Sequence, residues 1–404
     1  MKPLQTGKPD AAASRPRSNL ALLDSARGIA IIAVFLYHSL YQAFGRDELD
    51  WNGWVRSMHA PGEFFPLYPI TLGWTGVPIF FVISGFCIHL SSAKIQPLRL
   101  TDFYARRWFR IYPPFLVTLL FFALVFPYTR LDLHTRWGLW QFFSHFFLVH
   151  NLNARTEHGI VVAWWSVAVE FQLYLLYPLL SAAAQRSGWQ KVLLWTAVIE
   201  FGLRALGEAY TFATNNPIPA LVQMSPFYYL FSWCAGAALA DAHLKGESLP
   251  FGRTSAYAWA GALIISDFFK PLKDFSFTLA ALATAAVISR RMSAEGTLAA
   301  KKRGILGGLV QSHLKLVGRC SYSIYLIHHP IVEAWPRLVR HVLPAAPAHP
   351  LFMLACCLTS WSVVVPASYL LYRYVETPSI ELGKQFVNKL RHARAGRGPA
   401  GEAA

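Results

Sequence analysis

The sequence predicts an all-α, polytopic integral membrane protein with about ten transmembrane helices and both termini in the cytoplasm. Composition is the first observation behind this prediction: 54% of the 404 residues are hydrophobic and only 14% are charged, which exceeds what a soluble domain tolerates. The second is that the apolar residues form long runs, and the third is that the basic residues are distributed unevenly between those runs.

The apolar runs, taken in chain order, have roughly the length that a membrane-crossing helix needs. They cover residues 24–44, 73–90, 113–128, 161–181, 190–206, 221–241, 254–269, 275–289, 320–341 and 351–372. When the connecting loops alternate between the two sides, 27 of the 37 Lys and Arg residues fall on one side. Basic residues favour the cytoplasmic side, which places both termini there.

The remaining segments are expected to lie outside the spans. Residues 1–19 resemble a disordered basic lead, and residues 384–404 a basic cytoplasmic tail, which leaves 20–383 as one transmembrane domain. Residues 137–150 are too short to cross and are expected to form an in-plane helix at the outer face. Residues 304–318 are expected to form a cytoplasmic surface or re-entrant helix.

The net charge of +16 would suggest a nucleic-acid partner in a soluble protein. Here the charges lie between spans, so the expected partner is membrane lipid and no nucleic acid is expected. The five cysteines show no CxxC pair and no histidine at ligand spacing, so neither disulfides nor a metal site is predicted. The sequence has no GxxxxGK loop, which leaves ATP-driven transport without support.

Arg27 and His38 place two ionisable groups in the first apolar run, RGIAIIAVFLYH. Eleven helical steps of about 100° return to within about 20°, so both side chains share one face, about 16 Å apart. Glu170 and His328 each lie about 12–13 Å deep in other spans, and His38 about 15 Å deep. These costly groups are expected to face a polar cavity rather than lipid, although a structural role for His328 is equally compatible with the sequence.

Arg106, Arg107 and Arg110 lie at the cytoplasmic start of the third span, in RRWFRIYPP. They oppose the helix dipole, so an anion or lipid headgroup is needed to compensate them. Snorkelling to phospholipid is one interpretation. The other is a phosphate clamp, because guanidinium groups bind phosphate in a bidentate manner, and Arg27 would join it.

Six blocks of sequence resemble acyltransferase family 3, a family of integral membrane acyltransferases. They are RGIAIIAVFLYH, GVPIFFVISGFCI, RRWFRIYPPF, WWSVAVEFQLYLLYP, SYSIYLIHHP and RYVETP. The resemblance runs from about Leu20 to Pro378. It implies transfer of an acyl group, commonly acetyl, from cytoplasmic acyl-CoA to a hydroxyl of a carbohydrate or lipid-linked glycan, as in surface polysaccharide modification at the bacterial cytoplasmic membrane. It also implies acyl-CoA as donor substrate, with no permanently bound cofactor.

The family pattern falls on Arg27 and His38, on Arg107 and Arg110, and on Glu170. We therefore expect the arginines to bind coenzyme A, His38 to act as general base and Glu170 to orient it. Residues that would donate to the oxyanion, or else only pack, are Ser84, Ser166, Tyr322 and Tyr325.

Two alternatives stay open at this point. His38 would itself be acylated in a ping-pong route. Alternatively, the chain is a proton-coupled transporter or flippase for a sugar-containing substrate, because central ionisable groups among about ten spans are also typical of carriers.

Overall fold

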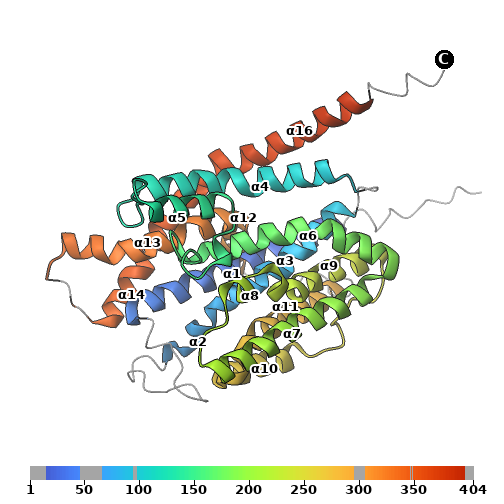
Figure 1. The fold of residues 1–404 in the computed structure, drawn as a ribbon, viewed down its shortest axis with the longest axis horizontal. Helices are drawn as coiled ribbons and strands as arrows, with labels where there is room; N and C mark the ends of the chain where they lie inside the picture. Colours follow the sequence, from blue (N-terminus) through green and yellow to red (C-terminus); the bar gives the residue numbers. More distant parts are fainter. Residues whose placement is uncertain are drawn as a thin grey trace, which may run out of the picture.

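The computed structural model describes residues 15–45, 66–93, 98–294, 305–345, 347 and 349–395. Within these ranges the regular structure is helical and contains no β-strand, which confirms the all-α prediction. The helices run side by side along one long axis and form an elongated bundle (Figure 1).

The bounds of the helices are as follows. The longer α-helices are α1 (Arg15–Phe44), α3 (Gly76–Ser92), α4 (Leu100–Leu120), α6 (Trp165–Ser187), α7 (Trp189–Thr214), α9 (Leu230–Lys245), α11 (Ser276–Ala294), α12 (Ile305–Arg319), α13 (Ser321–Val342) and α16 (Thr377–Ala395). The shorter ones are α2 (Tyr68–Thr71), α5 (Arg136–Phe146), α8 (Ala220–Gln223), α10 (Ala256–Phe268), α14 (Pro350–Thr359) and α15 (Trp361–Leu371). The 3-10 turns are η3 (Leu72–Thr75), η5 (His150–Leu152), η6 (Val162–Trp164), η7 (Pro226–Tyr229) and η8 (Lys270–Phe275), and the π-helical turns are η4 (Phe121–Val125) and η9 (Tyr372–Glu376).

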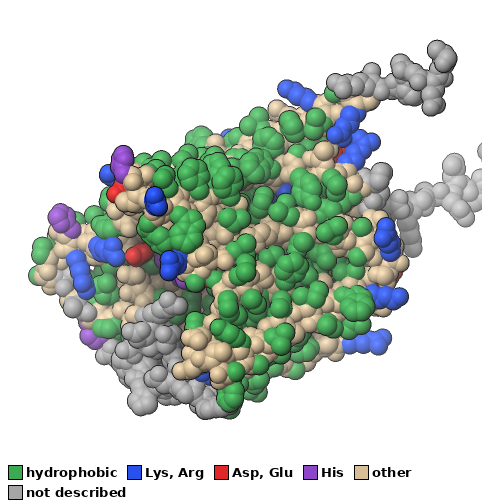
Figure 2. All heavy atoms as spheres, viewed as in Figure 1, with side chains coloured by type: hydrophobic (Ala, Val, Ile, Leu, Met, Phe, Trp, Pro, Cys, Tyr) green, Lys and Arg blue, Asp and Glu red, His purple; other side chains and the backbone are tan. Residues whose placement is uncertain are grey.

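Six helical stretches of the described residues are long and apolar enough to cross a membrane. They are Leu22–Phe44, Tyr68–Ser92, Leu100–Val125, Val162–Ser187, Lys270–Ser293 and Pro350–Arg394. Figure 2 shows charged side chains gathered toward the two ends of the bundle, with hydrophobic side chains over the surface between them. The chain is therefore a multi-pass membrane protein.

The other predicted spans are also helical, but each is either too short or too rich in charged residues to count as a membrane-crossing helix. α9 has 16 residues and α10 only 13, fewer than the roughly 20 that a bilayer requires. α7 contains the buried pair Glu200 and Arg204, and α13 contains Arg337 near its end. The count of about ten spans and the cytoplasmic placement of the termini stay predictions.

The observed helices begin and end at other residues than the boundaries predicted for the two terminal segments. Residues 1–14 lie outside the described residues, whereas residues 15–19 already belong to α1. The expected boundary at residue 384 falls inside α16, which packs along α4 with Arg391 Nε 2.7 Å from Asp102 Oδ2. The two short segments, residues 137–150 and 304–318, are largely helical, as α5 and α12. Their position relative to the bilayer stays a prediction.

α12 lies in close contact with the first half of α1. A Cβ on Gly318 would stand 1.8 Å from the carbonyl oxygen of Asp24, and one on Gly28 would stand 2.3 Å from that of Leu314. Only glycine permits backbones to approach so closely. The contact fixes α12 beside the turn of α1 that carries Arg27.

Candidate active site

A cavity of about 330 Å³ lies among α1, α3, α4, α6 and α13, and we call it the arginine cavity. All but three of the site residues predicted from the sequence line it. These are Arg27, Ser84, Arg107, Arg110, Ser166, Glu170, Tyr322 and Tyr325. Arg106, His38 and His328 do not line it. Helices far apart in the sequence therefore bring the expected cationic, acidic and hydroxyl groups to one space.

Among the described residues, three arginines and one carboxylate line this cavity. Arg27 Nη1 lies 3.2 Å from Asp24 Oδ1, which partly balances it. Arg107 donates from Nη2 to Ser91 Oγ at 2.9 Å, and its buried Nε finds no partner among the described residues. Arg110 is attracted by the buried carboxylate of Glu376. Glu170 is the carboxylate on the wall itself. Because the three arginines outnumber it there, the cavity is suited to an anionic ligand.

A chain of hydrogen bonds leads to Glu170 and fixes its orientation. Tyr174 donates to Glu170 Oε1 at 2.5 Å, and the Tyr174 oxygen lies 3.1 Å from Ser84 Oγ. Because the Tyr174 proton goes to the carboxylate, Ser84 must be the donor to Tyr174, and Ser84 in turn accepts from Trp233 Nε1 at 3.3 Å. The hydroxyl proton of Ser84 is therefore directed to Tyr174 in this state.

The other candidate oxyanion donors are also engaged. Tyr322 donates to the carbonyl of Ile111 at 2.8 Å, and Tyr325 donates to the carbonyl of Ala163 at 2.9 Å. Ser166 Oγ lies 2.6 Å from the Tyr325 oxygen and 3.4 Å from the carbonyl oxygen of Ala163. A role in stabilising an oxyanion would require these hydroxyls to turn.

His38 and His328 form a direct pair, with His38 Nδ1 3.0 Å from His328 Nε2. His328 Nδ1 lies 3.1 Å from the carbonyl oxygen of Ile324 and 3.0 Å from that of Tyr325. Carbonyl oxygens only accept, so the His328 proton is on Nδ1 and its Nε2 is the acceptor. His38 must donate from Nδ1, which leaves the lone pair of a neutral His38 on Nε2.

The histidine pair contacts residues that belong to two cavities. The His328 ring lies 5.5 Å from the ring of Tyr325, which lines the arginine cavity. The His38 ring lies 5.5 Å from that of Tyr37, which lines a second cavity. The structure thus places His328, rather than Glu170, against His38.

The second cavity has a volume of about 290 Å³, and we call it the aromatic cavity. Its aromatic wall is formed by Tyr37, Tyr41, Trp74, Trp165, Tyr228, Tyr229 and Phe277. Charged groups on the same wall are Arg204, Asp267, Lys273 and Asp274. Trp165 lines this cavity while the next residue of α6, Ser166, lines the arginine cavity. The two spaces therefore approach each other at the start of α6.

The histidines that follow α4 lie apart from the two cavities. The rings of His145 and His150 stack 4.0 Å apart, and burial lowers the pKa of His145 to about 4, so that it stays neutral near pH 7. Among the described residues, no group of three or more His, Cys, Asp or Glu side chains is placed to hold a metal ion.

Comparison with known families assigns the chain. The acyltransferase domain of family 3 matches residues 20–371, which is most of the sequence. The chain belongs to acyltransferase family 3. As a member with acyltransferase and O-acetyltransferase relatives, it is an O-acyltransferase.

Named relatives of this acyltransferase are distant but align over most of its length. Acyltransferase MdmB of Streptomyces mycarofaciens is 24% identical, and the alignment covers 90% of this chain and 92% of MdmB. Peptidoglycan O-acetyltransferase OatA of Listeria monocytogenes is 24% identical over 92% of this chain and 57% of its own length. O-acetyltransferase OatA of Staphylococcus aureus is 25% identical over 77% of this chain and 50% of its own. The acyltransferase spans about half the length of these two OatA proteins, and no solved structure matches it.

Several site residues of the acyltransferase escaped the sequence analysis. Tyr174 follows Glu170 by four positions, which places both on one helix face, so this spacing was available as a signal. Glu376 lies within the quoted RYVETP block, but nothing in that block indicates that its carboxylate is buried, bonded to Ser323 and close enough to attract Arg110. The aromatic cavity has no sequence signature, because its residues come from many separate elements.

Proposed function

We propose that this acyltransferase transfers an acyl group, commonly acetyl, from cytoplasmic acyl-CoA to a hydroxyl of a carbohydrate or lipid-linked glycan at the bacterial cytoplasmic membrane. The observation that carries the proposal is the convergence of Arg27, Arg107 and Arg110 on a cavity whose wall reaches the histidine pair. The acetyl group and the glycan class are supported by what the names of the OatA relatives say of those proteins.

The arginine cavity is suited to the donor. Coenzyme A carries several phosphate charges, and guanidinium groups bind phosphate with paired hydrogen bonds. In the proposed complex Arg107 and Arg110 hold these phosphates, with Arg27 beside them. The flexible pantetheine arm then extends along the cavity toward Tyr325 and the histidine pair.

His38 acts as the general base in this proposal. Its Nε2 lone pair takes the proton of the acceptor hydroxyl while the oxygen attacks the thioester carbon, giving a tetrahedral oxyanion. The carbon–sulfur bond then breaks, and the proton passes from Nε2 to the leaving thiolate, so that free coenzyme A and the ester are the products. His328 holds the productive tautomer by accepting from His38 Nδ1.

A ping-pong route uses the same lone pair. His38 Nε2 would attack the thioester carbon directly and release the coenzyme A thiolate before the acceptor arrives. A burst of free thiol from acetyl-CoA in the absence of acceptor indicates this route, whereas strict dependence on acceptor indicates direct transfer.

Acetyl-CoA binding to the purified protein in nanodiscs tests the donor assignment. Each lost charge-assisted contact costs about 1.5–3 kcal/mol, so we expect Arg107→Ala combined with Arg110→Ala to weaken binding by about 100-fold or more. Arg253→Ala, at an exposed arginine between α9 and α10, is the matched control and should bind normally. Unchanged binding by the double variant would contradict the proposal, and sugar uptake into proteoliposomes without thiol release would indicate a carrier instead.

A further inference from the structure

The aromatic cavity lies toward the end of α1 that is opposite to the arginine cavity. Along α1, Arg27 lines the arginine cavity, while Tyr37 and Tyr41 line the aromatic cavity. α6 runs in the reverse sense, because Trp165 lines the aromatic cavity and Tyr174, further along, lines the arginine cavity. A ligand in the aromatic cavity therefore approaches His38 from the side away from the donor arginines.

Flat aromatic rings form much of this wall. The rings of Trp165 and Tyr229 lie 5.6 Å apart, and those of Tyr37 and Tyr41 lie 4.9 Å apart. Trp74 adds a second indole from η3. Such faces bind apolar C–H surfaces, while polar groups around them fix the orientation of a ligand.

The described residues of this wall include charged groups of both signs. Arg204 and Lys273 supply two positive groups, and Asp267 and Asp274 supply two negative ones. An ionic ligand of either sign would therefore meet repulsion as well as attraction. The carboxylates accept hydrogen bonds, and the amide of Gln223 both donates and accepts, which matches a neutral ligand rich in hydroxyl groups.

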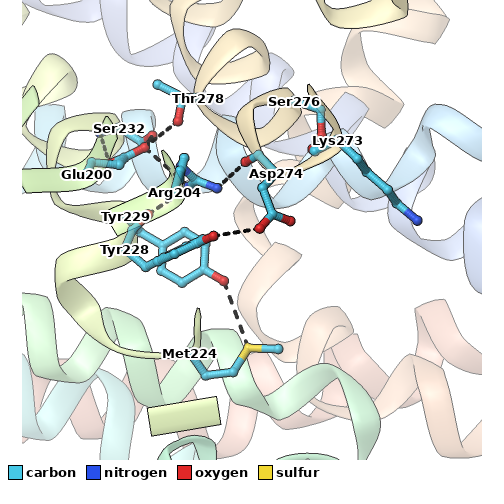
Figure 3. A network of polar contacts seen from close by, with 10 residues as sticks. All are labelled: Glu200, Arg204, Met224, Tyr228, Tyr229, Ser232, Lys273, Asp274, Ser276 and Thr278. Atoms are coloured by element: carbon cyan, nitrogen blue, oxygen red, sulfur yellow. Dashed lines mark hydrogen bonds and ion pairs between the residues drawn. The ribbon is translucent and has the colours of Figure 1, made fainter. Parts of the chain in front are cut away.

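Arg204 serves the wall rather than the ligand. Figure 3 shows its guanidinium between Glu200 and the backbone of Asp274, above the Tyr228 ring. Its Nη2 donates to Glu200 Oε1 at 3.3 Å and to the carbonyl of Tyr228 at 2.7 Å, and its Nη1 donates to the carbonyl of Asp274. With these contacts Arg204 joins η7, which carries Tyr228 and Tyr229, to η8, which carries Asp274.

Glu200, one turn before Arg204 on α7, anchors this arrangement. It is fully buried and accepts from the Ser232 amide at 3.0 Å, the Ser232 hydroxyl at 2.7 Å and the Thr278 hydroxyl at 2.5 Å. Tyr228 completes the network by donating to Asp274 Oδ2 at 2.8 Å. The Asp274 carboxylate is thus held in a fixed orientation at the cavity wall, as a preorganised polar contact requires.

We propose that the aromatic cavity is the acceptor subsite and binds a neutral sugar ring. The ring stacks its C–H face on Trp165 and Trp74, donates hydroxyls to Asp274 and Asp267, and directs a further hydroxyl past Tyr37 to His38 Nε2. The delivery step rests on the function proposed above, whereas binding of the sugar ring does not.

The test measures binding and transfer with the full-length protein in nanodiscs. The probes are neutral methyl glycosides of a hexose, a deoxyhexose and an N-acetylhexosamine, and a hexose phosphate as the charged comparison. The variants are Trp165→Leu and Asp274→Asn, which keeps a hydrogen-bond acceptor for Tyr228. Trp195→Leu is the matched control, because Trp195 on α7 is 65% exposed and lines neither cavity.

We expect at least one neutral glycoside to bind the parent protein, and both variants to weaken that binding by 10-fold or more. Trp195→Leu should bind it within twofold, and all forms should bind acetyl-CoA equally. The assignment is overturned if no glycoside binds the parent, if the variants bind like the parent, or if the hexose phosphate binds better than the neutral glycosides. Sugar binding that depends on Trp165, without any consumption of acetyl-CoA, would keep the subsite and overturn the proposed transfer.

Discussion

The arginine cavity and the aromatic cavity are nearly equal in volume, about 330 Å³ and about 290 Å³, but their walls have different charge. Among the described lining residues, the first has three arginines and one carboxylate, whereas the second has two positive and two negative groups. The difference indicates two ligands of different charge, an anionic one and a neutral one. The histidine pair contacts a wall residue of each cavity. A group passed from one ligand to the other would therefore have to pass beside this pair.

The arginines in the two cavities also differ in what they bind. Arg204 is 2% exposed, and both of its Nη atoms bond the protein, although its Nε lacks a partner among the described residues. Arg107 makes one side-chain hydrogen bond, and its Nε lacks a partner among the described residues. Arg204 is neutralised by its ion pair with Glu200, whereas no carboxylate of the described residues lies within ion-pair distance of Arg107. Arg204 therefore stabilises the fold, and Arg107 is the arginine suited to an anionic ligand.

The largest effect is expected for His38, which lines neither cavity. His38→Ala should lower kcat by about 100-fold to 10,000-fold, because general-base catalysis contributes that much. The KM values for acetyl-CoA and acceptor should stay near those of the parent, since both cavities remain intact. Steady-state transfer by the purified protein measures this, with His341→Ala on the exposed end of α13 as control. Transfer at the parent rate by folded His38→Ala protein would disprove the assignment.

The next largest effect should separate the two kinds of arginine. Arg204→Met leaves Glu200 buried without its ion-pair partner and should lower the free energy of unfolding by about 3–5 kcal/mol. Arg107→Met should change it by less than about 1 kcal/mol while weakening acetyl-CoA binding.

Unfolding in mixed micelles measures both changes. Combining Arg204→Met with Glu200→Met removes the unpaired charge and should recover most of the stability. Equal stability losses for the two arginines would remove the distinction between the cavities.

The arginine cavity was largely predictable from the sequence, and the aromatic cavity was not. Helical spacing put Arg27 and His38 on one face, and depth put Glu170, His38 and His328 at one level. His328 indeed bonds His38 directly. The depth of a residue in the membrane does not tell to which side of its helix the side chain points. It therefore did not reveal that Glu170 bonds Tyr174 instead of His38.

The aromatic cavity depends on packing between turns that share no sequence period. Trp74, Trp165 and Asp274 come from η3, α6 and η8, which only the tertiary fold brings together. One signal was present, because Glu200 and Arg204 stand four positions apart inside an apolar run. The sequence analysis did not single out this pair, which the fold buries as an internal ion pair.

A smaller effect is expected when the partner of His38 is changed. His328→Phe removes the acceptor for His38 Nδ1 and should lower kcat by about 10-fold to 100-fold. His328→Gln retains a side-chain acceptor and should recover part of this loss. The two variants should leave both KM values unchanged. If Phe and Gln are equivalent, His328 only packs and does not set the His38 tautomer.

The smallest effect should come from the hydroxyl that orients Glu170. Tyr174→Phe frees the carboxylate to approach the arginines, where it competes with phosphate for them. Since one hydrogen bond is worth about 0.5–1.5 kcal/mol net, the KM for acetyl-CoA should rise by about 2-fold to 10-fold. The acceptor KM should not change, because Tyr174 lies only on the arginine cavity.

Tyr177→Phe is the matched control for this variant. It removes a hydroxyl one turn further along α6 that bonds His89 at 3.1 Å and does not line the cavity. Its KM for acetyl-CoA should equal that of the parent. If Tyr174→Phe raises the acceptor KM as much as the donor KM, the two cavities do not bind separate substrates, because a change confined to one wall would then act on both.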